Sequence, residues 1–149
     1  MNMRFSLALP RESLSIRVLR RVLGDALRGL GVAEDCIGDI LVAASEACTN
    51  VIQHSHTPQD YEVLARVDGG VCELTVTDQG RGLTEESSAE PGDQAESGRG
   101  IKIMRALVDD VTFDTRPGQG TRVRLCKRLT WRDEALIRRL EGDLVHSAG

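Results

Sequence analysis

Residues 45–54 of this 149-residue chain carry polar side chains in a helical row. Glu46, Asn50 and His54 are four residues apart, so on a helix they lie one turn above each other on the same face. A carboxylate, a carboxamide and an imidazole in such a row could hold a water molecule, a metal ion or a phosphate. The row could also be the solvated edge of a packed helix, because such rows are common on surface helices.

Closely spaced glycines form three further groups that could bind a ligand. The pairs are Gly80 and Gly82, Gly98 and Gly100, and Gly118 and Gly120. Glycine lets backbone N–H groups approach a ligand closely, and a pair just before a helix could place phosphates at the positive helix N-terminus. The sequence has no G-x-x-x-x-G-K-[ST] motif and no G-x-G-x-x-G after a first strand. These absences exclude the P-loop and Rossmann types of phosphate site.

The periodicity of apolar residues predicts the elements that must position these groups. Strands are predicted at residues 3–9, 61–67, 71–77, 111–115 and 121–125, and helices at 11–30, 33–54, 98–108 and 131–146. Asp68-Gly69-Gly70 is a strong hairpin signal, because the turn needs residues that tolerate positive φ. We expect an α+β fold, a two-layer sandwich with helices on one face of a mixed, mostly antiparallel sheet.

The linkers and chain ends complete this prediction. Residues 84–97 contain almost nothing apolar and are predicted to form a polar loop, which is long for a compact domain. We expect residues 1–149 to form a single domain, with residues 131–146 as a C-terminal helical extension.

Composition narrows the classes of function. The net charge of −4 provides no basic surface for nucleic acid or an anionic membrane. The aromatic content of 3% argues against a protein that binds single-stranded nucleic acid by stacking its bases on aromatic side chains. The four cysteines are scattered without a C-x-x-C pair, which argues against zinc and suits a reducing cytosol. No stretch is long enough to span a bilayer. We therefore expect a cytoplasmic protein with no direct contact to nucleic acid or membrane.

The order of the polar row and the glycine groups resembles the Bergerat-fold (GHKL) ATPase superfamily. The N, G1, G2 and last glycine boxes of that superfamily are similar to Glu46-x-x-x-Asn50, Asp78-x-Gly80-x-Gly82, Gly98-x-Gly100-Ile101 and Gly118-x-Gly120-Thr121. The resemblance covers about residues 5–125. Within the superfamily, the short chain and residues 46–54 look most like the anti-sigma factor serine/threonine kinases, a family with a histidine-kinase-like (HATPase-type) regulatory domain.

The resemblance implies a role for each matched residue. Glu46 would be the catalytic general base, and Asn50 would supply an oxygen to Mg²⁺. Asp78 would accept a hydrogen bond from the adenine amino group, and Gly80 and Gly82 would let the chain pass close to the base.

The remaining matched residues would bind the rest of the nucleotide. The backbone N–H groups of Gly98, Arg99, Gly100 and Ile101 would cradle the phosphates. Thr121 would form a hydrogen bond near the adenine, and residues 84–97 would be a lid over the nucleotide. ATP and Mg²⁺ are therefore the implied cofactors.

The function implied by the resemblance is that of a protein serine/threonine kinase. Such a kinase phosphorylates a Ser or Thr of an anti-sigma factor antagonist, binds an RNA polymerase sigma factor, and is expected to form a homodimer. Two alternatives stay open at this point. The chain could be a non-catalytic ATP-binding module that gates a partner by its nucleotide state, or a simple ATPase in which water is the attacking group.

Overall fold

The computed structural model describes residues 2–54, 59–78, 91–116 and 120–132. They form five strands and three helices in the order β1(Met3–Leu9), α1(Ser13–Leu30), α2(Glu34–His54), β2(Tyr61–Asp68), β3(Val71–Asp78), α3(Pro91–Leu107), β4(Asp110–Arg116) and β5(Gly120–Arg128). Each predicted strand is present, and the first two predicted helices agree with α1 and α2 to within two residues. The C-terminal helix predicted at 131–146 falls almost wholly outside the described residues and stays a prediction.

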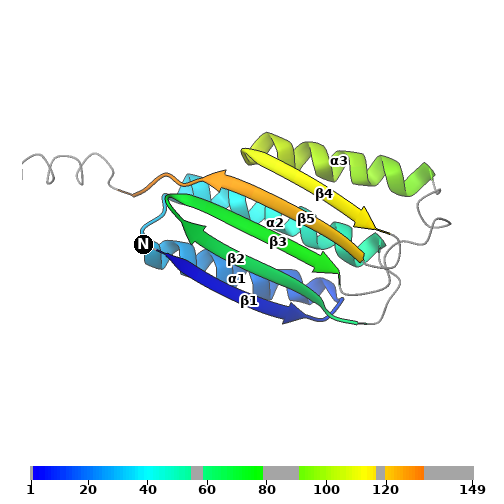
Figure 1. Ribbon diagram of the computed structural model, residues 1–149, viewed down its shortest axis with the longest axis horizontal. Coiled ribbons are helices and arrows are strands. Elements are labelled where there is room, and N and C mark those ends of the chain that lie inside the picture. The colour runs from blue at the N-terminus through cyan, green and yellow to red at the C-terminus, as the bar shows by residue number, and fades with distance from the viewer. Residues whose placement is uncertain (1, 55–58, 79–90, 117–119, 133–149) are drawn as a thin grey trace, which may run out of the picture.

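The strands form one sheet with the order β1-β2-β3-β5-β4. All pairings between these strands are antiparallel. Helices α1 and α2 lie across one face of this sheet, and α3 runs beside the β4 edge (Figure 1). The predicted α+β sandwich is therefore confirmed, with an antiparallel rather than a mixed sheet in the described part of the chain.

The β2–β3 hairpin helps to determine which strand ends lie side by side. Gly69 and Gly70 form its turn with φ of 60° and 78°, a conformation that favours glycine. This turn sets the register in which Tyr61 pairs with Asp78. On the other side of β3, Thr77 pairs with Arg122 of β5. The end of β3 and the start of β5 therefore meet at the same end of the sheet.

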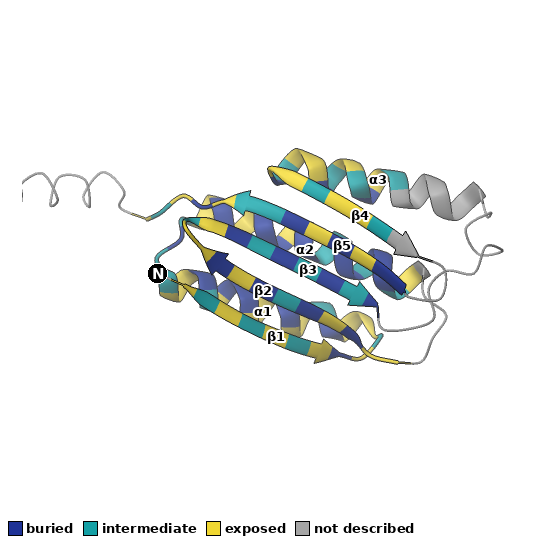
Figure 2. Cartoon of the chain, viewed as in Figure 1, coloured by how far each residue is buried: buried dark blue, intermediate teal, exposed yellow. Residues whose placement is uncertain are grey.

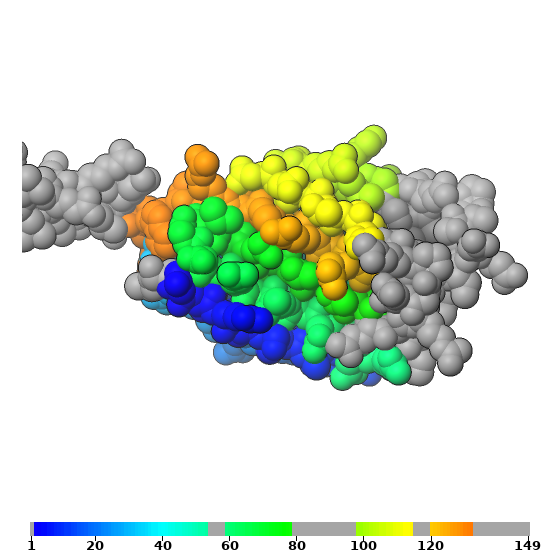
Figure 3. Space-filling model, in the orientation of Figure 1, coloured from blue at the N-terminus to red at the C-terminus, as the bar shows by residue number. Residues whose placement is uncertain are grey.

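The core lies between the sheet and the two helices that cover it. Residues of β2 alternate strictly, with Tyr61, Val63, Ala65 and Val67 buried and their neighbours turned outward (Figure 2). In the described part of the chain, the strands themselves form the surface of the opposite face (Figure 3). Its polar side chains include Arg124, which donates to Glu73 at 2.8 Å. One face of the sheet thus provides the core, and the other meets solvent.

The cysteines are unpaired thiols, as the scattered spacing predicted. Cys36, Cys48 and Cys72 are buried in the core, whereas Cys126 is half-buried. Burial raises the pKa of Cys48 and of Cys72 to about 12, because a thiolate is poorly solvated there. These thiols therefore pack as small apolar side chains.

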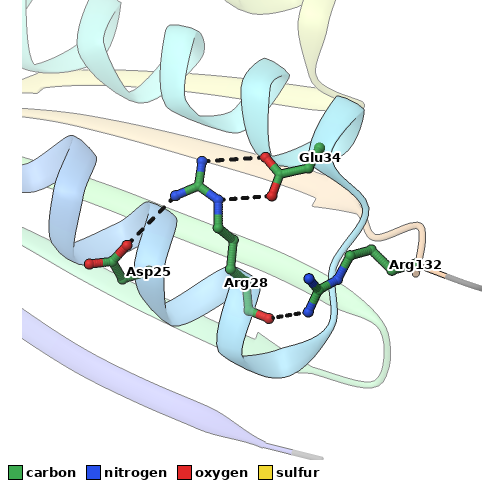
Figure 4. Close-up of polar contacts among 4 residues, drawn as sticks. All are labelled: Asp25, Arg28, Glu34 and Arg132. Carbon is green, nitrogen blue, oxygen red and sulfur yellow. Dashed lines mark hydrogen bonds and ion pairs between the residues drawn. The ribbon is translucent and has the colours of Figure 1, made fainter.

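Helix α1 ends at its C-terminus in a standard helix cap. Gly31 has φ of 90°, and the N–H groups of Gly31 and Val32 donate to the last carbonyls of α1, which is a Schellman arrangement. Next to this cap, Arg28 donates to Glu34 at 2.8 Å and lies 3.6 Å from Asp25 (Figure 4). Arg132 donates to the Arg28 carbonyl at 2.7 Å, so exposed polar contacts also join this end of α1 to the segment that follows β5.

The start of α3 differs from the prediction. The glycine pair Gly98 and Gly100 was expected to open the helix, but α3 begins at Pro91. Proline is favoured at the first helical position, where its fixed φ suits the helix and its missing N–H would have no partner. The predicted polar loop at 84–97 is therefore wrong for residues 91–97, while residues 84–90 lie outside the described residues. Gly98 and Gly100 lie more than one turn inside the helix.

Within the described ranges, no helix is both long enough and apolar enough to cross a membrane.

Candidate functional site

Glu46 and Asn50 of the predicted row on α2 lie against Gly100 on α3. A β-carbon at Gly100 would lie 3.2 Å from Oε2 of Glu46 and 3.7 Å from both side-chain amide atoms of Asn50. The backbone of α3 can approach the row this closely because residue 100 has no side chain. Gly100 is thus in contact with Glu46 and Asn50, although it lies far from them in the sequence.

Asn50 has a polar group without a partner. Its side chain is buried, and its Nδ2 has no hydrogen-bond partner among the residues that the structure describes. A buried polar atom that forms no hydrogen bond destabilises the folded chain, so such atoms call for an explanation. Glu46 is half-buried one turn before it. A ligand with a hydrogen-bond acceptor would satisfy the unpartnered nitrogen of Asn50.

Asp78 and Thr121 lie at the neighbouring end of the sheet. Thr77 pairs with Arg122, so the next residue of β3 and the preceding residue of β5 are adjacent in the same register. Both side chains are buried, with Asp78 only 1% exposed. A buried carboxylate beside a buried hydroxyl offers strong acceptors to a ligand that carries hydrogen-bond donors.

Sequence reasoning missed Arg11, which contacts this carboxylate. Nη2 of Arg11 donates to Oδ1 of Asp78 in an ion pair. Nη1 donates to the Val51 carbonyl at 2.9 Å, and Nε donates to the Gln59 carbonyl at 2.7 Å. No sequence signal could have found this role, because a single arginine between a strand and a helix is usually a solvated surface residue.

Tyr61 anchors the start of α1 beside the same corner. Its hydroxyl lies 2.6 Å from Oγ of Ser15, which also donates to the Glu12 carbonyl at 2.7 Å. Burial and the neighbouring Cys48 raise the pKa of Tyr61, so the hydroxyl stays protonated. The first turn of α1 is therefore fixed to the strand that pairs with Asp78.

The other predicted site residues are placed as follows. Gly98 and Ile101 are half-buried on α3, and Arg99 is exposed. Gly80 and Gly82 lie outside the described residues. The structure thus brings Glu46, Asn50 and Gly100 together, and it places Asp78 beside Thr121 at the end of the sheet.

The fold and the site together define a class of protein. A helix pair on one face of an antiparallel sheet, with a carboxylate–carboxamide row against a glycine, is the arrangement of an ATP-binding domain of the Bergerat type. Residues 9–127 match the family model described as a histidine kinase-like ATPase domain. The chain therefore belongs to the histidine kinase-like ATPase family, and within it to the anti-sigma factor kinases.

Two similar proteins support the narrower placement, and one solved structure supports the fold. The chain is 34% identical over 139 residues to an anti-sigma F factor of Halalkalibacterium halodurans, covering 87% of this chain and 92% of that protein. It is 30% identical over 123 residues to the serine-protein kinase RsbW of Bacillus velezensis, covering 74% and 77%. The fold is similar to the crystal structure of the RsbU and RsbW domains of a Mycobacterium tuberculosis protein, with a TM-score of 0.68 and 24% identity over 85% of this chain and 32% of that chain. The predicted resemblance is confirmed.

Proposed function

We propose that the chain is an ATP-dependent protein serine/threonine kinase of the anti-sigma factor type. It transfers phosphate to a Ser or Thr of an anti-sigma factor antagonist and binds an RNA polymerase sigma factor. The observation that carries this proposal is the contact of Gly100 with Glu46 and Asn50. This contact places a carboxylate and a carboxamide against the part of α3 that is proposed to border the phosphates.

Glu46 is proposed as the general base. Phosphoryl transfer depends mainly on positioning and on neutralising charge, so one carboxylate that orients the attacking hydroxyl can be sufficient. Its half-buried side chain lies on the same face as Asn50 and can be reached by a substrate side chain. A protein hydroxyl, rather than water, is favoured as the attacking group because serine-protein kinases are among the similar proteins.

Mg²⁺ is proposed to bind at Asn50 with the nucleotide phosphates. Among the described residues, no group of three or more His, Cys, Asp or Glu side chains is placed to hold a metal ion. Mg²⁺ fits this sparse set, because it prefers oxygen ligands and commonly binds one or two protein groups together with phosphates and water. The amide oxygen of Asn50 would bind the ion, and its unpartnered Nδ2 would donate to a phosphate oxygen. The ion would neutralise charge on the phosphates.

The nucleotide is proposed to lie between α2, α3 and the ends of β3 and β5. Asp78 would accept from the adenine amino group, with Thr121 beside it and Gly80 and Gly82 along the base. Gly98, Arg99, Gly100 and Ile101 would border the phosphates. Because α3 begins at Pro91, the phosphates would meet the bare Cα of Gly100 rather than a free helix N-terminus.

A homodimer in the cytoplasm completes the proposal. Leu14, Val18 and Val22 are exposed at successive turns along one side of α1 and could form an apolar contact between two copies. Sedimentation of the wild-type chain beside the Val18→Glu variant would test this contact, because a charge at its centre should shift the population toward monomer. Unpaired cysteines are consistent with a reducing compartment.

The kinase proposal is tested by incubating the purified chain with candidate antagonist proteins and labelled ATP in the presence of Mg²⁺. We expect label on a Ser or Thr of one antagonist. Glu46→Gln should reduce transfer at least about 100-fold while ATP still binds. Glu62→Gln on the open face of the sheet is the matched control and should transfer at the wild-type rate.

Two other results would contradict the proposal. ATP-dependent binding of a partner without any transfer, and without any effect of Glu46→Gln, would identify a non-catalytic switching module. Steady phosphate release that needs no protein substrate would identify a simple ATPase.

A further inference from the structure

Arg11 connects three separate segments of the chain at the base end of the site. It lies between β1 and α1, and its side chain is 9% exposed. Its three donor groups bond to the Asp78 carboxylate, the Val51 carbonyl and the Gln59 carbonyl. These acceptors belong to the end of β3, the last turn of α2 and the segment before β2. The planar guanidinium suits this task, because its donors have fixed directions.

The surroundings of Arg11 fix its position. Pro10 restricts the backbone before it, and the Glu12 N–H donates to the Pro10 carbonyl at 2.8 Å in a tight turn. Four residues later, Ser15 contacts the hydroxyl of Tyr61, the cross-strand partner of Asp78. The arginine is thus held from its own backbone and from the strand beside its carboxylate.

The partner of Arg11 is the carboxylate proposed to recognise adenine. A carboxylate as buried as that of Asp78 needs a countercharge, because removal from water disfavours an isolated ion. Arg11 supplies the countercharge and contacts a particular oxygen, Oδ1. It therefore sets both the charge balance and the orientation of the group that meets the base.

We propose that Arg11 is a positioning residue that gives the site its preference for adenine. The inference rests on the proposed function, in which Asp78 accepts from the 6-amino group. Adenine presents a donor at its 6-position, whereas hypoxanthine presents a carbonyl acceptor. An oriented carboxylate favours the donor and repels the carbonyl oxygen. When Arg11 is absent, the carboxylate loses the charged contact that helps to orient it and discriminates less between the two bases.

The test compares the binding of ATP and of inosine triphosphate, both with Mg²⁺, by calorimetry. The wild-type chain should bind ATP more tightly than inosine triphosphate. Arg11→Met should weaken ATP binding about tenfold, the effect of one lost charge-assisted contact. The binding of inosine triphosphate should change much less, so the ratio of the two Kd values should fall by most of that factor. A purely structural role would weaken both nucleotides equally.

Two further variants control for folding and for charge. Arg11→Lys keeps the charge without the fork of donors and should give an intermediate ratio, and it supplies the result if Arg11→Met does not fold. Arg28→Met removes another ion-paired arginine associated with α1, at the opposite end of the helix, and should retain the wild-type ratio.

The outcomes separate the two proposals. A wild-type chain that binds neither nucleotide would overturn the proposed function, and this inference with it. A wild-type chain that prefers ATP, with the same preference in Arg11→Met and Arg11→Lys, would overturn the inference alone. An equal loss of both nucleotides in these variants would also overturn it.

Discussion

Helix α1 is flanked by two ion-paired arginines whose surroundings differ. Arg11 precedes the helix at the site end and is 9% exposed, and its partner Asp78 is more deeply buried still. Arg28 lies near the opposite end of α1 with its side chain 44% exposed, and its partner Glu34 is more exposed still. Surface pairs such as the second contribute little to stability, because water and salt screen them.

The difference extends to the other polar groups at each end. At the far end, Gly31 and Val32 satisfy the last carbonyls of α1, and Arg132 adds a further donor. At the site end, a carboxylate is buried and the amide of Asn50 has an unpartnered nitrogen in the described part of the chain. Groups that stabilise the free protein poorly are thus gathered where a nucleotide is proposed to bind, as expected for a functional site.

The largest expected effect comes from replacing Asn50 by leucine. Phosphotransfer should fall by about 100-fold or more because a proposed ligand of Mg²⁺ is lost. The free energy of unfolding should rise by about 1 kcal/mol, since a buried unpartnered amide is removed. Urea titration and the transfer assay measure the two effects. Gln53→Leu, at an exposed position on the same helix, should leave transfer unchanged, and a marked loss of stability in Asn50→Leu would contradict this account.

The two arginines should differ in their effect on stability. Arg11→Met removes the arginine that pairs with the buried carboxylate of Asp78 and should lower the free energy of unfolding by about 3 kcal/mol. Arg28→Met should leave the urea midpoint close to that of the wild type. Raising the salt concentration should change the cost of Arg11→Met little, because a buried pair is poorly screened. Equal losses of stability in Arg11→Met and Arg28→Met would contradict the difference between the two ends of α1.

The contact between α2 and α3 can be changed with a single methyl group. Gly100→Ala should displace the Glu46 carboxylate by a few tenths of an ångström and lower phosphotransfer about tenfold. Gly38→Ala is the matched helical control, because a β-carbon there has no neighbour within 4 Å. It should retain full transfer and gain about 0.5–1 kcal/mol of stability from its helix propensity. Normal transfer by Gly100→Ala would show that the approach of α3 is not used in catalysis.

The smallest expected effect concerns the hydroxyl of Tyr61. Tyr61→Phe removes its contact with Ser15 and should lower the free energy of unfolding by about 1 kcal/mol. Ser15 keeps its bond to the Glu12 carbonyl, so helix α1 should still begin at the same residue. Thermal unfolding followed by circular dichroism measures the loss. A loss of stability as large as that of Arg11→Met would contradict this prediction, because Tyr61 would then be the main residue that holds the start of α1.

Much of this molecule could be predicted from local pattern. Apolar periodicity predicted the strands and the first two helices, and the turn at Gly69 and Gly70 predicted the hairpin. The order of the boxes predicted that Glu46, Asn50 and the glycines at 98 and 100 would belong to one nucleotide site, and Gly100 does lie against Glu46 and Asn50. These features depend on residues that are close in sequence or on glycines in recurrent patterns.

The parts that failed depend on other information. The predicted start of α3 is wrong because the glycines at 98 and 100 indicate a helix start. Pro91, seven residues before Gly98, can begin the helix without the loss of a hydrogen bond. Arg11 was missed because its partners lie 40, 48 and 67 residues away in the chain. Only the folded register of the sheet brings them together.

The reactivity of the buried thiols measures how often the fold opens locally. Thiol reagents attack the thiolate, and both burial and a pKa of about 12 keep Cys48 and Cys72 unreactive near neutral pH. Half-buried Cys126 should be alkylated first, and the core cysteines only when α2 separates from the sheet. Their rates of labelling therefore report the free energy of that opening, site by site and without an added probe. A nucleotide that closes the site should slow the labelling of Cys48 on α2, two residues after Glu46.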